Sequence, residues 1–256
     1  MPIYARKQKP NDQEVVTEKS SGLLNLGKVF GVMFLGILIT AVGSILWGWL
    51  LSSFASNPDQ ESLYSGLLVG GTIVGFLTMM ISSSIINWKA FRNKGGKFAL
   101  VAPYVTYALS LSLIFGLVTL ALPLEIIAIT FGVTLFIYGL LTLFGVLFKK
   151  SNLNPLVYVI SALGTGVLIL FLLNWFVFPL FVGGGSEVLF WILSFGIFAL
   201  IMFTTIFDVW QINKIISTMP PSMNMTLYFA FRLYTDFVNL FIRILYYVVI
   251  LFGRRR

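Results

Sequence analysis

Seven long apolar segments, separated by short polar or turn-rich breaks, occupy almost the whole chain. They run over residues 29–51, 63–88, 98–120, 126–148, 156–178, 188–212 and 225–252. Each is long enough to cross about 30 Å of hydrocarbon as a helix, since a spanning helix needs roughly 20 apolar residues. Only 10% of the 256 residues are charged, which is too few to cover the surface of a soluble domain of this size. The pattern predicts an all-α, polytopic membrane protein, a bundle of seven transmembrane helices.

The chain divides into a tail and one membrane domain. Residues 1–22 are polar, lack hydrophobic periodicity and end before the first apolar segment, which is typical of a mobile tail. Residues 23–256 are expected to form the seven-helix transmembrane domain. The seven segments and their short connections leave no room for a separate soluble domain.

Basic residues of the tail and loops gather on one predicted side of the membrane. They stand before the first span, between the second and third, and after the fourth and sixth: Arg6, Lys7, Lys9, Lys19, Lys28, Lys89, Arg92, Lys94, Lys97, Lys149, Lys150 and Lys214. The opposite loops carry Asp59, Glu61, Glu125 and Glu187 and no basic residue. Because loop lysine and arginine stay in the cytoplasm, the N-terminus is expected there. The arginines at 254–256 are the exception, since seven spans place them outside and a re-entrant last segment would place them inside.

The net charge of +8 follows from this topology and does not indicate a nucleic-acid partner, because no basic cluster interleaved with aromatic residues is present. Membrane lipid is the expected partner of such a chain. The chain has no cysteine and no histidine. Disulfides, thiol catalysis, metal sites built on these residues and imidazole-based mechanisms are therefore excluded.

Four ionisable residues lie within the predicted spans: Asp208, Arg232, Asp236 and Arg243. Each costs about 3 kcal/mol or more at the membrane centre, so such residues usually belong to a functional site. Arg232, Asp236, Asn239 and Arg243 follow one another at spacings of four, three and four residues and share one helical face. That face is expected to line the bundle interior or a wet cavity rather than contact lipid.

Two interpretations of these charges stay open. In the first, Asp208 is a solvated residue at headgroup level, and Arg232 neutralises Asp236 in a static pair. In the second, Asp208 and Asp236 contact each other. Two carboxylates in contact cannot both ionise cheaply, so the pair would titrate as a unit. Protonation would hold the two helices together and deprotonation would separate them, which describes a proton-operated gate.

The residues around the two aspartates resemble the end of the Bax inhibitor-1 (transmembrane Bax inhibitor motif) family. The matching stretches are FDVWQI at 207–212, LY at 227–228 and LYTDFVNLF at 233–241, of which the last is the most specific. Softer similarity covers residues 106–115 and NWF at 174–176. The resemblance implies a seven-helix bundle with a central C-terminal helix and a pH-sensitive calcium leak across the membrane. Calcium ions and protons are then expected as partners besides membrane lipid.

The same resemblance implies roles for individual residues. Asp208 and Asp236 would form the pH-sensing gate, and a basic residue at the cytoplasmic end of span two would latch onto the pair. Lys89 and Arg92 both stand there, and Arg92 is favoured. The chain departs from the family pattern at Arg232, one turn before Asp236, so the gate is expected to close at a lower pH than in relatives.

The family's second latch, a span-two Glu paired with a late span-seven Arg, is expected to be absent, because Tyr246 stands at the late position. Asn239 and Arg243 are expected, like Arg232, to modulate the pair.

Several functions are compatible with the buried acids. A calcium leak channel would use Asp208 and Asp236 as a weak, transient site for the transported ion, since calcium prefers oxygen ligands. A proton-coupled secondary transporter would use the same acids as a relay, although no internal repeat is visible. A non-conducting interaction protein is the further alternative. Intramembrane aspartyl proteolysis is disfavoured because the glycine-rich surroundings of such acids are missing. We expect no enzymatic activity, no cofactor, and a multi-pass location in a bacterial plasma membrane.

Overall fold

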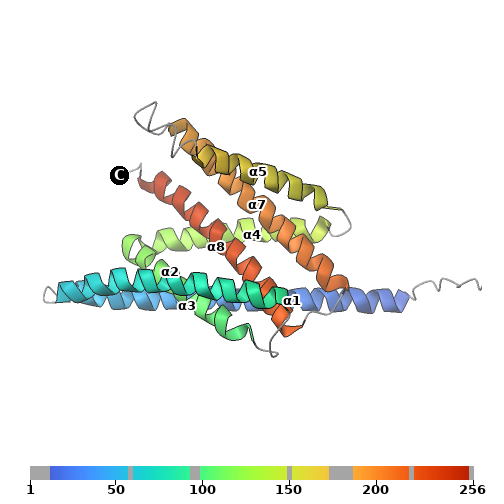
Figure 1. Cartoon of the computed structure of the whole chain (residues 1–256), viewed down its shortest axis with the longest axis horizontal. Helices are drawn as coiled ribbons and strands as arrows, with labels where there is room; N and C mark the ends of the chain where they lie inside the picture. Colours follow the sequence, from blue (N-terminus) through green and yellow to red (C-terminus); the bar gives the residue numbers. More distant parts are fainter. Residues whose placement is uncertain are drawn as a thin grey trace, which may run out of the picture.

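The computed structural model describes residues 12–56, 60–92, 99–148, 152–172, 187–218 and 222–253, and these residues form seven α-helices, with no strand among them (Figure 1). The helices are α1 (Asp12–Ala55), α2 (Glu61–Arg92), α3 (Val101–Ala121), α4 (Leu124–Leu147), α5 (Asn154–Leu172), α7 (Glu187–Thr218) and α8 (Met223–Gly253).

All seven helices are long and apolar enough to cross a membrane. The spans are Asn25–Ala55, Glu61–Ala90, Val101–Ala121, Leu124–Leu147, Asn154–Leu172, Val188–Thr218 and Met223–Leu251. Each coincides with one predicted apolar segment, except that the predicted end of the fifth segment, residues 173–178, lies outside the described residues. The predicted all-α, seven-helix membrane bundle is confirmed.

Two helices extend beyond the apolar segments that predict them. Helix α1 begins at Asp12, ahead of the domain boundary predicted at residue 23, while residues 1–11 lie outside the described part. Helix α7 continues past Ile212 to Thr218, and Asn213 and Ile216 in this extension are buried against the rest of the bundle. Lys214 in this extension is exposed and lies over the Trp210 ring at 4.8 Å. The mobility of residues 1–22 stays a prediction.

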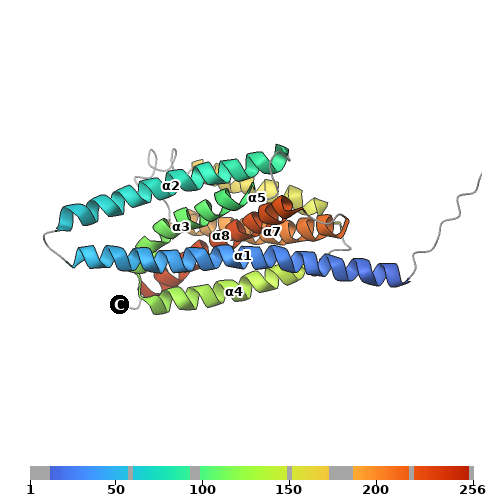
Figure 2. The same cartoon turned by 90° about the horizontal axis from the view of Figure 1, so that it is seen from below.

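Helix α8 occupies the centre of the bundle. It packs against α1, α2, α3, α4 and α7, whereas α5 packs on α7 at the periphery. Figure 1 shows α8 crossing the molecule diagonally, and Figure 2 shows it lying between α2 on one side and α4 on the other. The side chains of Leu233, Tyr234 and Leu240 on α8 are fully buried. The last helix is therefore the central one, as the family resemblance implies.

Tyrosine hydroxyl groups tie α8 and α3 to their neighbours. Tyr234 shares a hydrogen bond with the Thr40 hydroxyl of α1, and Tyr138 of α4 donates to the Leu233 carbonyl at 3.2 Å. Tyr104 of α3 donates to the Val32 carbonyl of α1 at 2.9 Å. Buried polar groups in a membrane must find partners within the protein, and these bonds therefore fix how the helices are rotated against one another.

The most extensive contact between two helices, that of α1 with α3, involves small residues. A side chain at Gly43 would overlap Ser112, whose Oγ lies 2.6 Å from the position that a Cβ would take. Gly36 and Gly48 on the same helix face Tyr104 and Thr119 in the same way. Small residues allow two transmembrane helices to approach closely, so this stripe of glycines explains why α1 and α3 pack together along their length.

Candidate functional site

The charged residues of α7 and α8 meet at the interface of these two helices. Asp208 of α7 is 3% exposed and Asp236 of α8 is 8% exposed, so both carboxyl groups lie inside the bundle. Apolar residues around them, including Val209 and Leu233, are completely buried and press the two helices together. The interpretation of Asp208 as a solvated headgroup residue does not fit this burial.

Arg232 of α8 is held by two side chains of α7. Its Nη2 donates to Asp208 Oδ1 at 2.5 Å, and its Nη1 donates to Gln211 Oε1 at 2.8 Å. Asp208 and Gln211 are three residues apart, which places both on one face of α7. The guanidinium is thus fixed at both ends, and the bond to the carboxylate is a charge-assisted one. Arg232 therefore bridges the two helices and does not pair with Asp236 of its own helix.

Asp236 is a direct neighbour of Asp208. The two carboxyl groups are close enough to share a hydrogen bond when one of them carries a proton. Asp236 Oδ2 is buried and has no hydrogen-bond partner among the described residues. A buried polar atom without a partner costs free energy. A proton shared between the two carboxyl groups is the simplest way to reduce that cost.

A tyrosine of α4 lies beside the pair. The Tyr138 ring packs edge-on against the Phe237 ring, with 5.4 Å between the ring centroids. The Tyr138 hydroxyl group is close enough to Asp208 and Asp236 to interact with them electrostatically. Tyr138 is 3% exposed. Neither Tyr138 nor Gln211 was recognised from the sequence as part of the site. The i, i+3 spacing from Asp208 is the signal that points to Gln211, whereas nothing local marks Tyr138.

Of the two latch candidates on α2, the structure describes the side chain of Lys89 but not that of Arg92. Lys89 Nζ donates to the Ala99 carbonyl at 3.3 Å, which ties the end of α2 to the turn before α3. Arg92 is the last residue of α2, and its side chain lies outside the described residues, as do residues 93–98. The assignment of Arg92 as a latch therefore stays a prediction.

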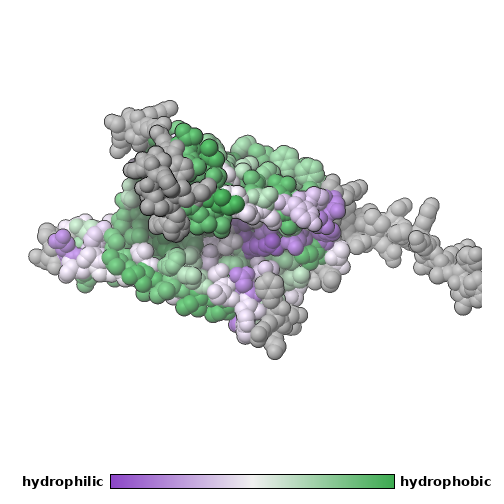
Figure 3. All heavy atoms as spheres, turned by 45° about the horizontal axis from the view of Figure 1, so that its top comes forward, coloured by the Kyte–Doolittle hydropathy of each residue, from purple (hydrophilic) through white to green (hydrophobic). Residues whose placement is uncertain are grey.

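The predicted polar face of α8 is partly buried and partly exposed. Asn239, predicted to face inward with Asp236, is exposed. Arg243 is half-buried, approaches Ser194 Oγ with Nη1 at 3.5 Å and lies 6.0 Å from the Tyr246 ring. Figure 3 shows a hydrophilic band between hydrophobic areas of the molecular surface. The exposure of Asn239 corrects a purely interior assignment of this face and fits the alternative of a wet cavity, whereas Arg243 is again covered in part by α7.

The described residues contain no group of three or more acidic side chains that would hold a metal ion tightly. Asp208 and Asp236 supply carboxylate oxygens, but Arg232 already occupies one oxygen of Asp208. Calcium sites of high affinity use six to eight oxygen ligands. The arrangement therefore suits at most a weak and transient encounter with a cation.

The fold and this interface define a class of protein: an integral, multi-pass, all-α membrane protein whose central last helix carries a buried acidic pair. A family model described as Inhibitor of apoptosis-promoting Bax1 matches residues 24–255, so the chain belongs to this family, the Bax inhibitor-1 family. The resemblance found in the two aspartate motifs is confirmed. No curated protein and no solved structure matches the chain.

Proposed function

We propose that the protein is a pH-sensitive calcium leak channel, gated by the Asp208–Asp236 pair. The observation that carries the proposal is the burial of two neighbouring carboxyl groups at the interface of α7 with the central helix α8. Ionisable residues inside a membrane protein usually mark an ion or proton pathway. Membership of the Bax inhibitor-1 family supports the same function.

The gate follows from counting charges at the interface. With one proton on the pair, the charge of the remaining carboxylate is balanced by Arg232, and the two carboxyl groups can share a hydrogen bond. Loss of that proton leaves two carboxylates against one guanidinium in a low-dielectric environment, where repulsion is strong. The repulsion favours separation of α7 from α8. Flux is therefore expected to rise as pH rises through the titration of the pair.

The conducting path follows the polar face of α8. Asp236 lies at its buried part and Asn239, almost one turn further along the helix, is exposed. Separation of α7 from α8 would join the buried carboxyl groups to this open region. Calcium would then pass oxygen ligands without being trapped, as a leak requires. We place the N-terminus in the cytoplasm and the protein in a bacterial plasma membrane.

The test is calcium flux into vesicles that contain the purified protein, measured with an enclosed calcium dye, at several pH values and with or without a proton gradient. A leak channel gives downhill flux that depends on pH and needs no proton gradient. Uphill calcium accumulation that requires the gradient would identify a proton-coupled transporter instead. Flux equal to that of protein-free vesicles at every pH would show that the protein does not conduct calcium.

A further inference from the structure

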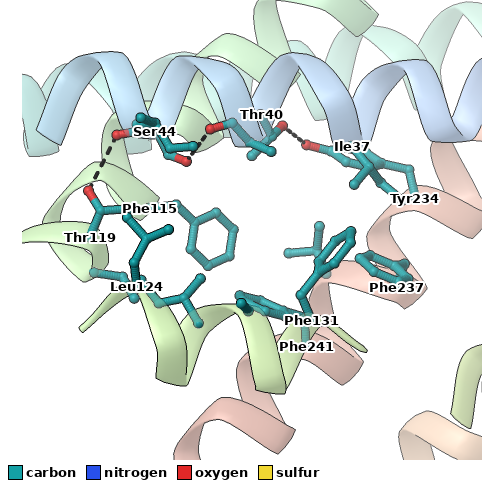
Figure 4. Close-up of a pocket in the computed structure, with 16 residues that line it drawn as sticks. Ile37, Thr40, Ser44, Phe115, Thr119, Leu124, Phe131, Tyr234, Phe237 and Phe241 are labelled. Atoms are coloured by element: carbon teal, nitrogen blue, oxygen red, sulfur yellow. Dashed lines mark hydrogen bonds between the residues drawn. The ribbon is translucent and has the colours of Figure 1, made fainter. Parts of the chain in front are cut away.

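A cavity lies on the side of α8 that faces away from the acidic pair. It measures about 220 Å³ and is enclosed by α1, α3, α4 and α8 (Figure 4). Tyr234, Phe237 and Phe241 of α8 line one side of it together with Phe131 of α4, whose ring packs edge-on against Phe237 and Phe241 (Figure 4). On a helix with 3.6 residues per turn, Tyr234 and Phe241 lie on the face roughly opposite to Asp236, and Phe237 lies about a quarter of a turn away from it. The cavity is therefore separate from the proposed gate.

The cavity has a lateral mouth between α1 and α4. Its lining includes Ala41 and Ile45 of α1 and Leu124 and Ala128 of α4, all four of which are exposed. These residues belong to membrane-spanning segments, and Ile45 and Leu124 are 51% and 66% exposed. In a bilayer such side chains face lipid. The mouth therefore opens toward hydrocarbon rather than toward water.

The lining offers no polar atom to a ligand, although four hydroxyl groups surround the cavity. The hydroxyl group of Thr40 bonds to Tyr234 and to the carbonyls of Gly36 and Ala108. Ser44 donates to the Ala41 carbonyl at 2.9 Å, and Thr119 donates to the Gly116 carbonyl at 2.7 Å. Because these hydroxyl groups are satisfied within the protein, a polar ligand would lose its hydrogen bonds on entering. The occupant must be apolar.

We propose that this cavity is a binding site for the acyl chain of a membrane lipid, which enters from the bilayer between α1 and α4. An apolar cavity of about 150 Å³ stays dry and accepts benzene, so the larger cavity here has room for a segment of hydrocarbon chain. Lipid tails are the apolar molecules that surround the mouth at this depth. The acyl chain packs against Phe237 and Phe241 of the same helix that carries Asp236. The proposal does not rest on calcium conduction.

The experiment uses the full-length protein in phosphatidylcholine vesicles that contain a small fraction of phosphatidylcholine with a photoactivatable diazirine in one acyl chain. After irradiation, the labelled residues are mapped by mass spectrometry. Phe237 is 3% exposed, so a chain reaches it only from within the cavity, whereas Phe136 on α4 is 68% exposed and reports lipid at the outer surface. We expect label on both Phe237 and Phe136.

Two variants separate entry through the mouth from other routes. Ala128→Phe places a ring at the exposed mouth, and Ala162→Phe makes the same change at an exposed position of α5, away from the cavity. Ala128→Phe should reduce labelling of Phe237 several-fold and leave Phe136 unchanged, and Ala162→Phe should change neither. Label on Phe136 without label on Phe237, or labelling of Phe237 that survives Ala128→Phe, would overturn the proposal.

Discussion

Arg232 of α8 bonds to Asp208 of α7 and not to Asp236, although Asp236 follows it by one turn on the same helix. The cation that holds Asp208 in this structure therefore comes from the central helix itself. This arrangement excludes the static Arg232–Asp236 pair that the sequence left open. Asp236 Oδ2, in contrast, is buried and has no hydrogen-bond partner in the described part of the chain.

Removal of Arg232 is expected to move the pH response. Arg232→Ala takes away the charge that compensates the pair, so a proton is lost less readily and the midpoint of the flux transition should rise by about one to three pH units. The midpoint is the quantity to measure in vesicles, because losing the cross-helix bond also changes resting flux. Arg243→Ala is the matched control on the same helix, since Arg243 approaches Ser194 and not the pair. An unchanged midpoint in Arg232→Ala would show that Arg232 does not control the titration.

Gln211 is expected to act through Arg232. Gln211→Leu removes the acceptor for Nη1, so the guanidinium is held less firmly and the midpoint should shift in the same direction as in Arg232→Ala, by a smaller amount. A double-mutant cycle measures the coupling: once Arg232 is alanine, Gln211→Leu should have no further effect. Independent, additive shifts would contradict the bridging role that the hydrogen bonds assign to Arg232.

The transmembrane segments and the identity of the acidic residues were predictable from the sequence, whereas their contacts were not. A run of some 20 apolar residues identifies each span by itself. The partner of Arg232 depends on the rotation of α7 against α8, which is set by buried residues such as Val209 that carry no local signal. The exposure of Asn239 and the role of Tyr138 depend in the same way on which neighbouring helix covers α8.

The glycine stripe of α1 gives a prediction about stability. Gly43→Val should lower stability by about 1–3 kcal/mol, because the added side chain overlaps Ser112 in a tightly packed interface. Gly31→Val on the same helix is the control, since nothing lies within 4 Å of the position a Cβ would take there. Thermal unfolding in detergent compares the two variants. Equal losses would mean that helix propensity, and not the α1–α3 contact, sets the effect.

Substitutions of Arg92 and Lys89 test which of these two basic residues at the end of α2 is the latch. Arg92→Ala should raise resting calcium flux at neutral pH if Arg92 helps to hold the closed state by pairing with Asp208. Lys89→Ala should have little effect, because Lys89 Nζ is bound to the Ala99 carbonyl. If the Lys89 variant raises flux and the Arg92 variant does not, the latch is Lys89 and its bond to Ala99 must open.

The most direct measurement is the pH profile of calcium flux in vesicles that contain Asp208→Asn or Asp236→Asn. In the proposed gate the pair responds to pH because two neighbouring carboxyl groups cannot both ionise cheaply, and either substitution removes one of them. Both variants should give flux that no longer changes between about pH 6 and 8, the range in which a coupled carboxyl group can titrate in a chain without histidine. If both variants keep the wild-type profile, the proton-operated gate is not at Asp208 and Asp236, and the proposed mechanism is wrong.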